Sequence, residues 1–236
     1  MNRNIELTAA LAIVAIALMA APAAAAVASV VEADGWSWIR SDDPDNFGTG
    51  TRIGATGTLS AEDALRTIMS FDLTGHTGFT IDPASQLTLH VDRDDHDTTA
   101  GLQTLELYLL PQDFRNGADG GASWNKSDEG VAWPTPGAIQ AGDTPLATTD
   151  IDMGGSIAGL DLVFASSDLN VAIQNAIDAG ERLNLGLKAP GLEYDAFGPR
   201  AIVWTQGPTG ENPATLVIPE PATLGLLGLG GLGMLL

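Results

Sequence analysis

Alternation between apolar and polar residues predicts a chain built mainly from short β-strands. In residues 65–73, apolar side chains occupy alternating positions, and Arg66, Ser70 and Asp72 fall on the opposite face. A period of two is typical of a strand that buries one face. The same period recurs in residues 87–91, 105–109 and 183–187. Shorter candidate strands are residues 36–40, 51–55, 147–151, 201–205 and 214–218.

One segment has a helical pattern instead. Residues 168–179 place apolar side chains, among them Ile173 and Ile177, on one face at helical spacing. Ser167 is the expected N-cap, and Gly180 is placed to end the helix. A strand-rich chain with one short helix predicts an all-β fold, specifically a single antiparallel β-sandwich.

Residues 1–28 differ in composition from the rest of the chain. Arg3 is followed by an apolar run and then by small residues, which is the order of a secretory signal peptide. Cleavage sites of the A-x-A type end at Ala26 and at Ala28. The apolar run is shorter than the ~20 residues that a membrane-spanning helix needs. We therefore expect an N-terminal signal helix and export rather than a permanent anchor.

The C-terminal residues 219–236 combine a Pro-Glu-Pro motif, Pro219, Glu220 and Pro221, with an apolar segment rich in glycine. This closely resembles the PEP-CTERM sorting signal of Gram-negative bacteria, which a membrane-bound exosortase processes during export. The resemblance implies transient anchoring in the inner membrane and delivery to the cell surface or the extracellular matrix. The basic cluster that ends this signal is missing here, which weakens retention of the apolar sorting helix in the membrane. The alternative, a buried C-terminal helix, is disfavoured by the repeated glycines.

Charge and composition narrow the classes of partner. The chain has 30 acidic and 10 basic residues, a formal net charge of −20. We expect no nucleic-acid partner, because a polyanion would be repelled and no basic stripe reverses the field. The absence of cysteine excludes disulfides, Cys-based zinc sites and thiol nucleophiles. Apolar residues make up 44% of the chain, enough to give residues 29–218 a single core.

Short motifs in a fixed order span the predicted domain. They are residues 38–40, 45–48, 52–54, 65–73, 85–91, 124–125, 133–138, 168–180 and 212–216. Together they resemble the DNRLRE family, although Asn212 stands where that family often has arginine. The resemblance implies a jelly-roll-like sandwich related to carbohydrate-binding modules. It also implies an exported or matrix protein without catalytic machinery.

Two acidic segments are candidate sites for a structural calcium ion. Their carboxylates are Asp92, Asp94, Asp95 and Asp97 in one segment and Asp42 and Asp45 in the other. Calcium takes six to eight oxygen ligands and tolerates loops. The first segment is not an EF-hand, because Asp97 stands where the loop glycine belongs. The alternative for both segments is a solvated turn.

Trp124 and Trp133 lie in a region rich in glycine and proline, where exposed rings can stack on the apolar face of a sugar. This makes them the candidate glycan-binding residues, with a core position as the alternative. Trp36 and Trp38 share one strand face and are expected in the core.

Catalytic patterns are weak in this sequence. Residues 154–158 lack the final glycine of a nucleophile elbow, and the acidic residues are too numerous to single out a hydrolytic pair. We expect an exported, non-catalytic protein that is sorted by an exosortase-type system and associates with exopolysaccharide. The alternatives are a purely structural, calcium-stabilised module and a polysaccharide-degrading enzyme.

Overall fold

The computed structural model describes residues 28–41, 44–45, 51–55, 64–81, 85–95, 101–115, 121–193, 200–204 and 213–219. The strands of this part are β1 (Ala28–Glu32), β2 (Gly35–Arg40), β3 (Thr51–Ala55), β4 (Leu65–Asp72), β5 (Gln86–Asp95), β6 (Leu102–Leu109), β7 (Lys126–Asp128), β8 (Val131–Ala132), β9 (Ala147–Asp152), β10 (Asp161–Phe164), β11 (Arg182–Lys188), β12 (Arg200–Trp204) and β13 (Thr215–Pro219). The helices are the 3-10 turn η1 (Thr74–His76) and the α-helix α2 (Ser167–Ala179).

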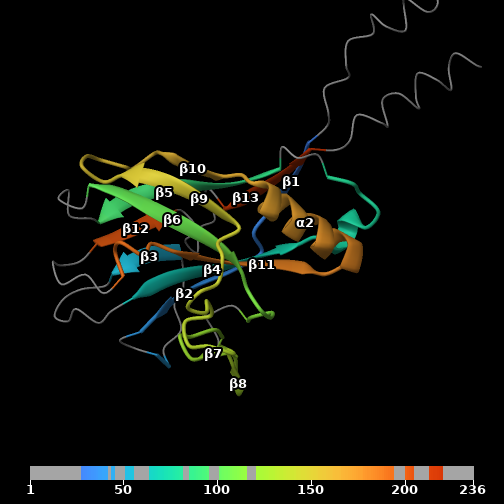
Figure 1. Ribbon diagram of the computed structural model, residues 1–236, viewed down its shortest axis with the longest axis horizontal. Coiled ribbons are helices and arrows are strands. Elements are labelled where there is room, and N and C mark those ends of the chain that lie inside the picture. The colour runs from blue at the N-terminus through green and yellow to red at the C-terminus, as the bar shows by residue number, and fades with distance from the viewer. Residues whose placement is uncertain are drawn as a thin grey trace, which may run out of the picture.

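Eleven strands form one hydrogen-bonded sheet, nine of them in a continuous path, and β7 and β8 form a separate hairpin. The path runs β1-β13-β5-β12-β3-β4-β11-β6-β9, with β10 attached to β5 and β2 attached to β4. Strand β5 belongs to both layers, because its first half pairs with β13 and β10 and its second half with β12. Figure 1 shows the strands in two layers, with α2 at one end of the sandwich. The predicted antiparallel β-sandwich with one α-helix is confirmed for the described residues.

The strands with the clearest period of two were predicted correctly. They are β4, β5, β6 and β11. Four strands of only two to five residues were not predicted, namely β1, β7, β8 and β10. Three of these four strands have only two to four residues, over which a period of two cannot be recognised.

The main core lies between the layers and is closed by α2. Met69 and Phe71 of β4 and Leu185 of β11 are fully buried in it. Leu107 of β6 is buried there as well, whereas Leu109, predicted on the same face, is 51% exposed. Leu109 is the last residue of β6, and its side chain lines surface grooves instead of the core.

The opposite face of β4 is also buried, which the sequence analysis did not predict. Arg66 and Ser70 are 8% and 2% exposed, and Ile68 packs in a second hydrophobic cluster. Much of this cluster comes from residues between 108 and 139, which cover the outer face of the sheet. Gly186 of β11 allows the close approach, because a Cβ there would lie 2.7 Å from Leu110 Cδ2. This covering layer includes the β7–β8 hairpin, seen below β2 and β4 in Figure 1.

The ends of α2 are fixed by two capping residues. The N-cap is Ser166, whose Oγ accepts a hydrogen bond of 2.9 Å from the backbone N–H of Leu169. The predicted N-cap, Ser167, is wrong by one residue and is instead the first helical residue. Gly180 ends the helix as predicted, with a left-handed φ of 66° and its N–H donating to Ala176 O and Ile177 O.

The two ends of the described chain lie side by side. Strand β1 pairs with β13 so that Ala28 is opposite Pro219. The segments that precede β1 and follow β13 therefore attach at the same end of one strand pair. Of the predicted signal helix and sorting helix, only Ala28 and Pro219 are described, and Glu220 and Pro221 lie outside the described residues. Among the described helices, none has the length and apolar character needed to span a membrane.

Candidate functional site

The first acidic segment lies in a strand and not in a turn. Asp92, Asp94 and Asp95 belong to β5, which continues through Asp95 because its second half pairs with β12. The interpretation of these three residues as a loop is therefore wrong. Asp97 lies outside the described residues. Calcium binding by this segment stays a prediction.

The second acidic segment is described only in part. Asp45 is exposed, and its Oδ1 lies 3.4 Å from Lys126 Nζ of the β7–β8 hairpin. Asp42 lies outside the described residues. Across the part of the chain that the structure describes, no three or more histidine or acidic side chains gather as metal ligands would.

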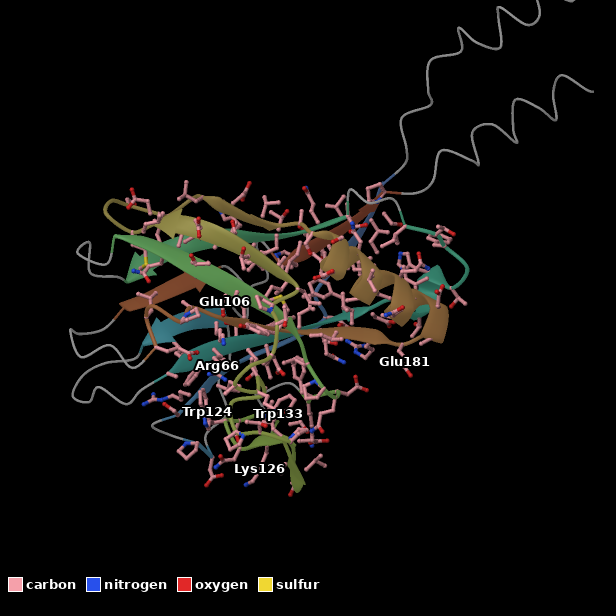
Figure 2. All side chains as sticks on the ribbon, in the orientation of Figure 1. Arg66, Glu106, Trp124, Lys126, Trp133 and Glu181 are labelled. Atoms are coloured by element: carbon pink, nitrogen blue, oxygen red, sulfur yellow. The ribbon has the colours of Figure 1, made fainter. Side chains whose placement is uncertain are left out.

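Trp124 and Trp133 are buried, so the expectation that they are exposed is wrong. Their exposed fractions are 8% and 4%, and both belong to the second hydrophobic cluster. Trp133 Nε1 donates a 2.9 Å hydrogen bond to Ser123 O. Figure 2 shows the two rings beneath Arg66, and the Arg66 Cζ atom lies 4.8 Å from the Trp124 ring centre. Both residues therefore occupy core positions, which was the alternative to glycan binding. Neither offers an open ring face to a sugar.

The two tryptophans of β2 are less buried than predicted. Trp36 and Trp38 are both of intermediate exposure, whereas their neighbours Ser37 and Ile39 are fully buried. Arg40 lies on the same strand face, with its Cζ 5.7 Å from the Trp38 ring centre.

Arg66 anchors the covering layer to the sheet and is paired with Glu193. Arg66 Nε and Nη2 donate to the two carboxylate oxygens of Glu193 at 2.7 and 3.0 Å. Its Nη1 donates to Gly137 O at 2.9 Å and to Ile139 O at 3.3 Å. The guanidinium therefore has buried partners on three sides, as a buried charge requires. It fixes the segment around Gly137 against β4.

The backbone at Gly137 and Ala138 is left-handed at two consecutive residues. Their φ angles are 81° and 66°. A Cβ on Gly137 would lie 2.7 Å from both Arg66 Nη1 and Trp124 Cζ2, so only glycine fits there. Ala138 adopts the same region without that freedom, which costs roughly 1–2 kcal/mol.

A second cluster of polar side chains connects β6 and β11. Tyr108 Oη donates a 2.5 Å hydrogen bond to Glu106 Oε2, and Lys188 Nζ lies 3.4 Å from the same oxygen. Lys188 Nζ also lies 4.5 Å from the Tyr108 ring centre. Burial, and then the hydrogen bond to Glu106, raises the pKa of Tyr108 above its ordinary value.

Two grooves adjoin at the end of β6. Groove 1, about 310 Å³ in volume, lies between Tyr108 and the segment 134–144. Groove 2, about 670 Å³, lies between α2, the start of β11 and residues 109–113. Both linings include Leu109 and Pro111, so the grooves meet at these two residues.

Groove 2 contains a buried amide that is only partly satisfied. Asn184 of β11 is 7% exposed, and its Nδ2 donates a 2.5 Å hydrogen bond to Asp113 Oδ1. Its Oδ1 is buried and accepts no hydrogen bond from any described residue. Buried polar atoms normally have partners, so Asn184 Oδ1 keeps the capacity to accept a hydrogen bond from solvent or from a ligand. Small side chains on α2, Ala172, Ala176 and Ala179, leave the groove open.

The arginine of groove 2 already has partners. Arg182 Nε donates to Ser70 Oγ at 2.9 Å, and its Nη2 is hydrogen-bonded to Asp34. Asp113 also lines this groove, as does Glu181, which Figure 2 places at the end of α2. Groove 2 is therefore suited to hydrogen bonding with a neutral, hydroxylated ligand more than to binding an anion.

The residues that line the two grooves were not predicted from the sequence. Asn184 carries a weak signal, because it is a polar residue between two leucines of β11. The alanines of α2 and the exposed Leu109 resemble ordinary helix and core residues. Their role in the grooves follows from the packing of α2 against the end of β6 and the start of β11.

No protein-family model and no curated protein sequence matches the chain. Of the solved structures that match, one is described as a xylan-binding module CBM15. It is 11% identical, with a TM-score of 0.32 and coverage of 82% of this chain and 97% of that chain. At this identity and TM-score the likeness supports no argument about function. The comparisons do not confirm the resemblances to the DNRLRE family and the PEP-CTERM signal.

Proposed function

We propose that the chain is a non-catalytic polysaccharide-binding module that is exported and held at the cell surface or in the extracellular matrix. The observation that carries this proposal is groove 2, with its buried and incompletely bonded Asn184 beside Asp113. Sugar hydroxyls both donate and accept hydrogen bonds, and amide and carboxylate side chains match them. Ligand grooves typically combine an apolar lining with a few polar groups of this kind.

The export and sorting part of the proposal rests on the two ends of the chain. The signal-peptide pattern of residues 1–28 and the motif at Pro219, Glu220 and Pro221 support it. The pairing of Ala28 with Pro219 is consistent with anchoring through both ends before processing, because both predicted apolar segments attach to one strand pair. The processing partner would be an exosortase-type protease.

Binding is tested by applying the purified full chain to a glycan array, with and without calcium. Binding to polysaccharides without release of sugar fragments is the expected result. Failure to bind any glycan would favour the purely structural module instead. Release of reducing ends from a bound polymer would make the protein an enzyme.

Sorting is tested separately by expressing the full chain in an exosortase-bearing host. The expected result is a surface or secreted product that lacks the segment after Pro219. A final product that keeps residues 219–236 intact would contradict the processing.

A further inference from the structure

We infer that groove 1 and groove 2 act as a single trough for one neutral polysaccharide chain, with Leu109 and Pro111 between two subsites. This inference rests on the proposed polysaccharide binding and deepens it. Its starting point is that Leu109 and Pro111 line both grooves. A ligand that fills one groove therefore contacts the same two residues as a ligand in the other.

The apolar centre of the trough suits a sugar ring. Leu109 is 51% exposed although it follows the buried Leu105 and Leu107 on the same strand face. Pro111 is exposed beside it. A pyranose ring has an apolar face, and covering Leu109 with it would remove apolar surface from water.

Polar groups flank this centre on both sides. In groove 2 they are Asn184, whose Oδ1 has no described donor, and Asp113, which accepts from Asn184 Nδ2. In groove 1 they include Thr135 and Asp143. The Asp143 carboxylate is oriented by a 2.9 Å hydrogen bond from Gln140 N. Successive sugar residues on either side of Leu109 would therefore each find hydroxyl partners.

The charges of the trough select against acidic polymers. Asp113, Glu181 and Asp143 contribute three carboxylates, whereas Arg182 is already hydrogen-bonded to Ser70 and to Asp34. The resulting negative potential adds to that of a chain with a net charge of −20. A neutral chain avoids this repulsion.

The walls of the trough are held in place from behind. The segment that lines groove 1 is fixed by the hydrogen bonds from Arg66 to Gly137 O and Ile139 O. The α2 wall of groove 2 is capped at both ends and packs its apolar face into the main core. Such preorganised walls reduce the ordering cost of binding.

The first test is titration calorimetry of the full chain with neutral oligosaccharides of two lengths. The probes are cello-, xylo- and manno-configured disaccharides and hexasaccharides, with polygalacturonate as the acidic polymer. For at least one neutral series, the hexasaccharide is expected to bind at least about tenfold more tightly than the disaccharide, because only the longer chain reaches both subsites. Equal affinity at both lengths, or tighter binding of polygalacturonate, would overturn the inference.

The second test uses two matched pairs of variants. Leu109→Asp is expected to weaken hexasaccharide binding by more than about tenfold, and Leu102→Asp to leave it unchanged. Leu102 is a suitable control because it is 69% exposed on the same strand and outside both grooves. Asp113→Ala is expected to weaken binding by about tenfold and Asp150→Ala to have no effect. Both carboxylates accept one side-chain hydrogen bond, from Asn184 and from Thr104 respectively.

The outcomes separate this inference from the proposed function. If the wild-type chain binds no neutral glycan, the proposed function fails. If it binds and both Leu109→Asp and Asp113→Ala bind equally well, polysaccharide binding stands and the trough is wrong. Melting temperatures show whether each variant is folded, and Leu109→Ser replaces Leu109→Asp if the aspartate variant unfolds. A folded Leu109→Ser variant is expected to lose affinity in the same direction.

Discussion

Arg66 and Glu193 are 127 positions apart in the sequence and form a two-point ion pair at 2.7 and 3.0 Å, with side-chain exposures of only 9% and 7%. The pair lies where the covering layer meets β4. Because Arg66 also donates to Gly137 O and Ile139 O, one guanidinium connects the sheet to two separate chain segments. The wall of groove 1 depends on this connection.

Removing one partner of this pair is expected to destabilise the protein strongly. In Glu193→Ala the Arg66 charge stays buried without its carboxylate, which should lower the free energy of unfolding by about 3–5 kcal/mol. Arg115→Ala is the control, because Arg115 is 49% exposed and lies 3.8 Å from Asp128. That variant should change stability by less than about 1 kcal/mol. Urea unfolding measures both, and similar losses in the two variants would contradict the structural role of Arg66.

Substitutions at Gly137 and Ala138 are expected to change the stability of the protein in opposite directions. Gly137→Ala should destabilise by about 1–3 kcal/mol, because the added Cβ meets Arg66 Nη1 and Trp124 at a residue with φ of 81°. Ala138→Gly should stabilise by roughly 0.5–1 kcal/mol, because relief of the left-handed strain exceeds the greater freedom of the unfolded chain. Thermal unfolding of the two variants checks the signs. A stable Gly137→Ala protein would show that this turn rearranges easily.

The sequence predicted the sandwich because the strands that enclose the main core carry apolar side chains at every second position. It did not predict the covering layer. On β4, Arg66 and Ser70 have the alternation of a solvent-facing strand side, yet both are buried. The cause is the covering layer between residues 108 and 139, which has little regular structure and therefore little periodicity. Local patterns carry no information about such a distant cover.

The candidate site was harder to predict than the fold. Trp124 and Trp133 were assigned to an exposed loop because glycine and proline surround them, but irregular backbone can also be packed against a sheet. Arg66 lies over Trp124, and Trp133 Nε1 is satisfied by Ser123 O, so both rings are integrated into this layer. The grooves depend on where α2 and the end of β6 come together, which is a tertiary property.

The stability of the protein is expected to fall at alkaline pH in a way that depends on Tyr108. Burial, together with the hydrogen bond to Glu106, raises the pKa of Tyr108 above the ordinary value of 10.0. Because the unfolded chain loses this proton first, the contribution of Tyr108 is complete below about pH 10 and declines as the pH rises further. Tyr108→Phe should lack this part of the decline. Urea unfolding of both proteins between about pH 8 and about pH 11 measures the difference, and identical slopes would contradict it.

Calcium is expected to raise the melting temperature through the carboxylates of the sequence-predicted segments. Binding to the folded state alone would stabilise it by about 2.7 kcal/mol at a hundredfold excess of calcium over Kd. The variants Asp92→Asn and Asp42→Asn decide which segment is responsible, because each removes a carboxylate from one segment only. Asp45→Asn should have the smaller effect within the second segment, since Asp45 already faces Lys126 at 3.4 Å. Equal melting temperatures in chelator and in millimolar calcium would show that these acidic segments bind no calcium. The glycan trough would then have no requirement for a metal ion.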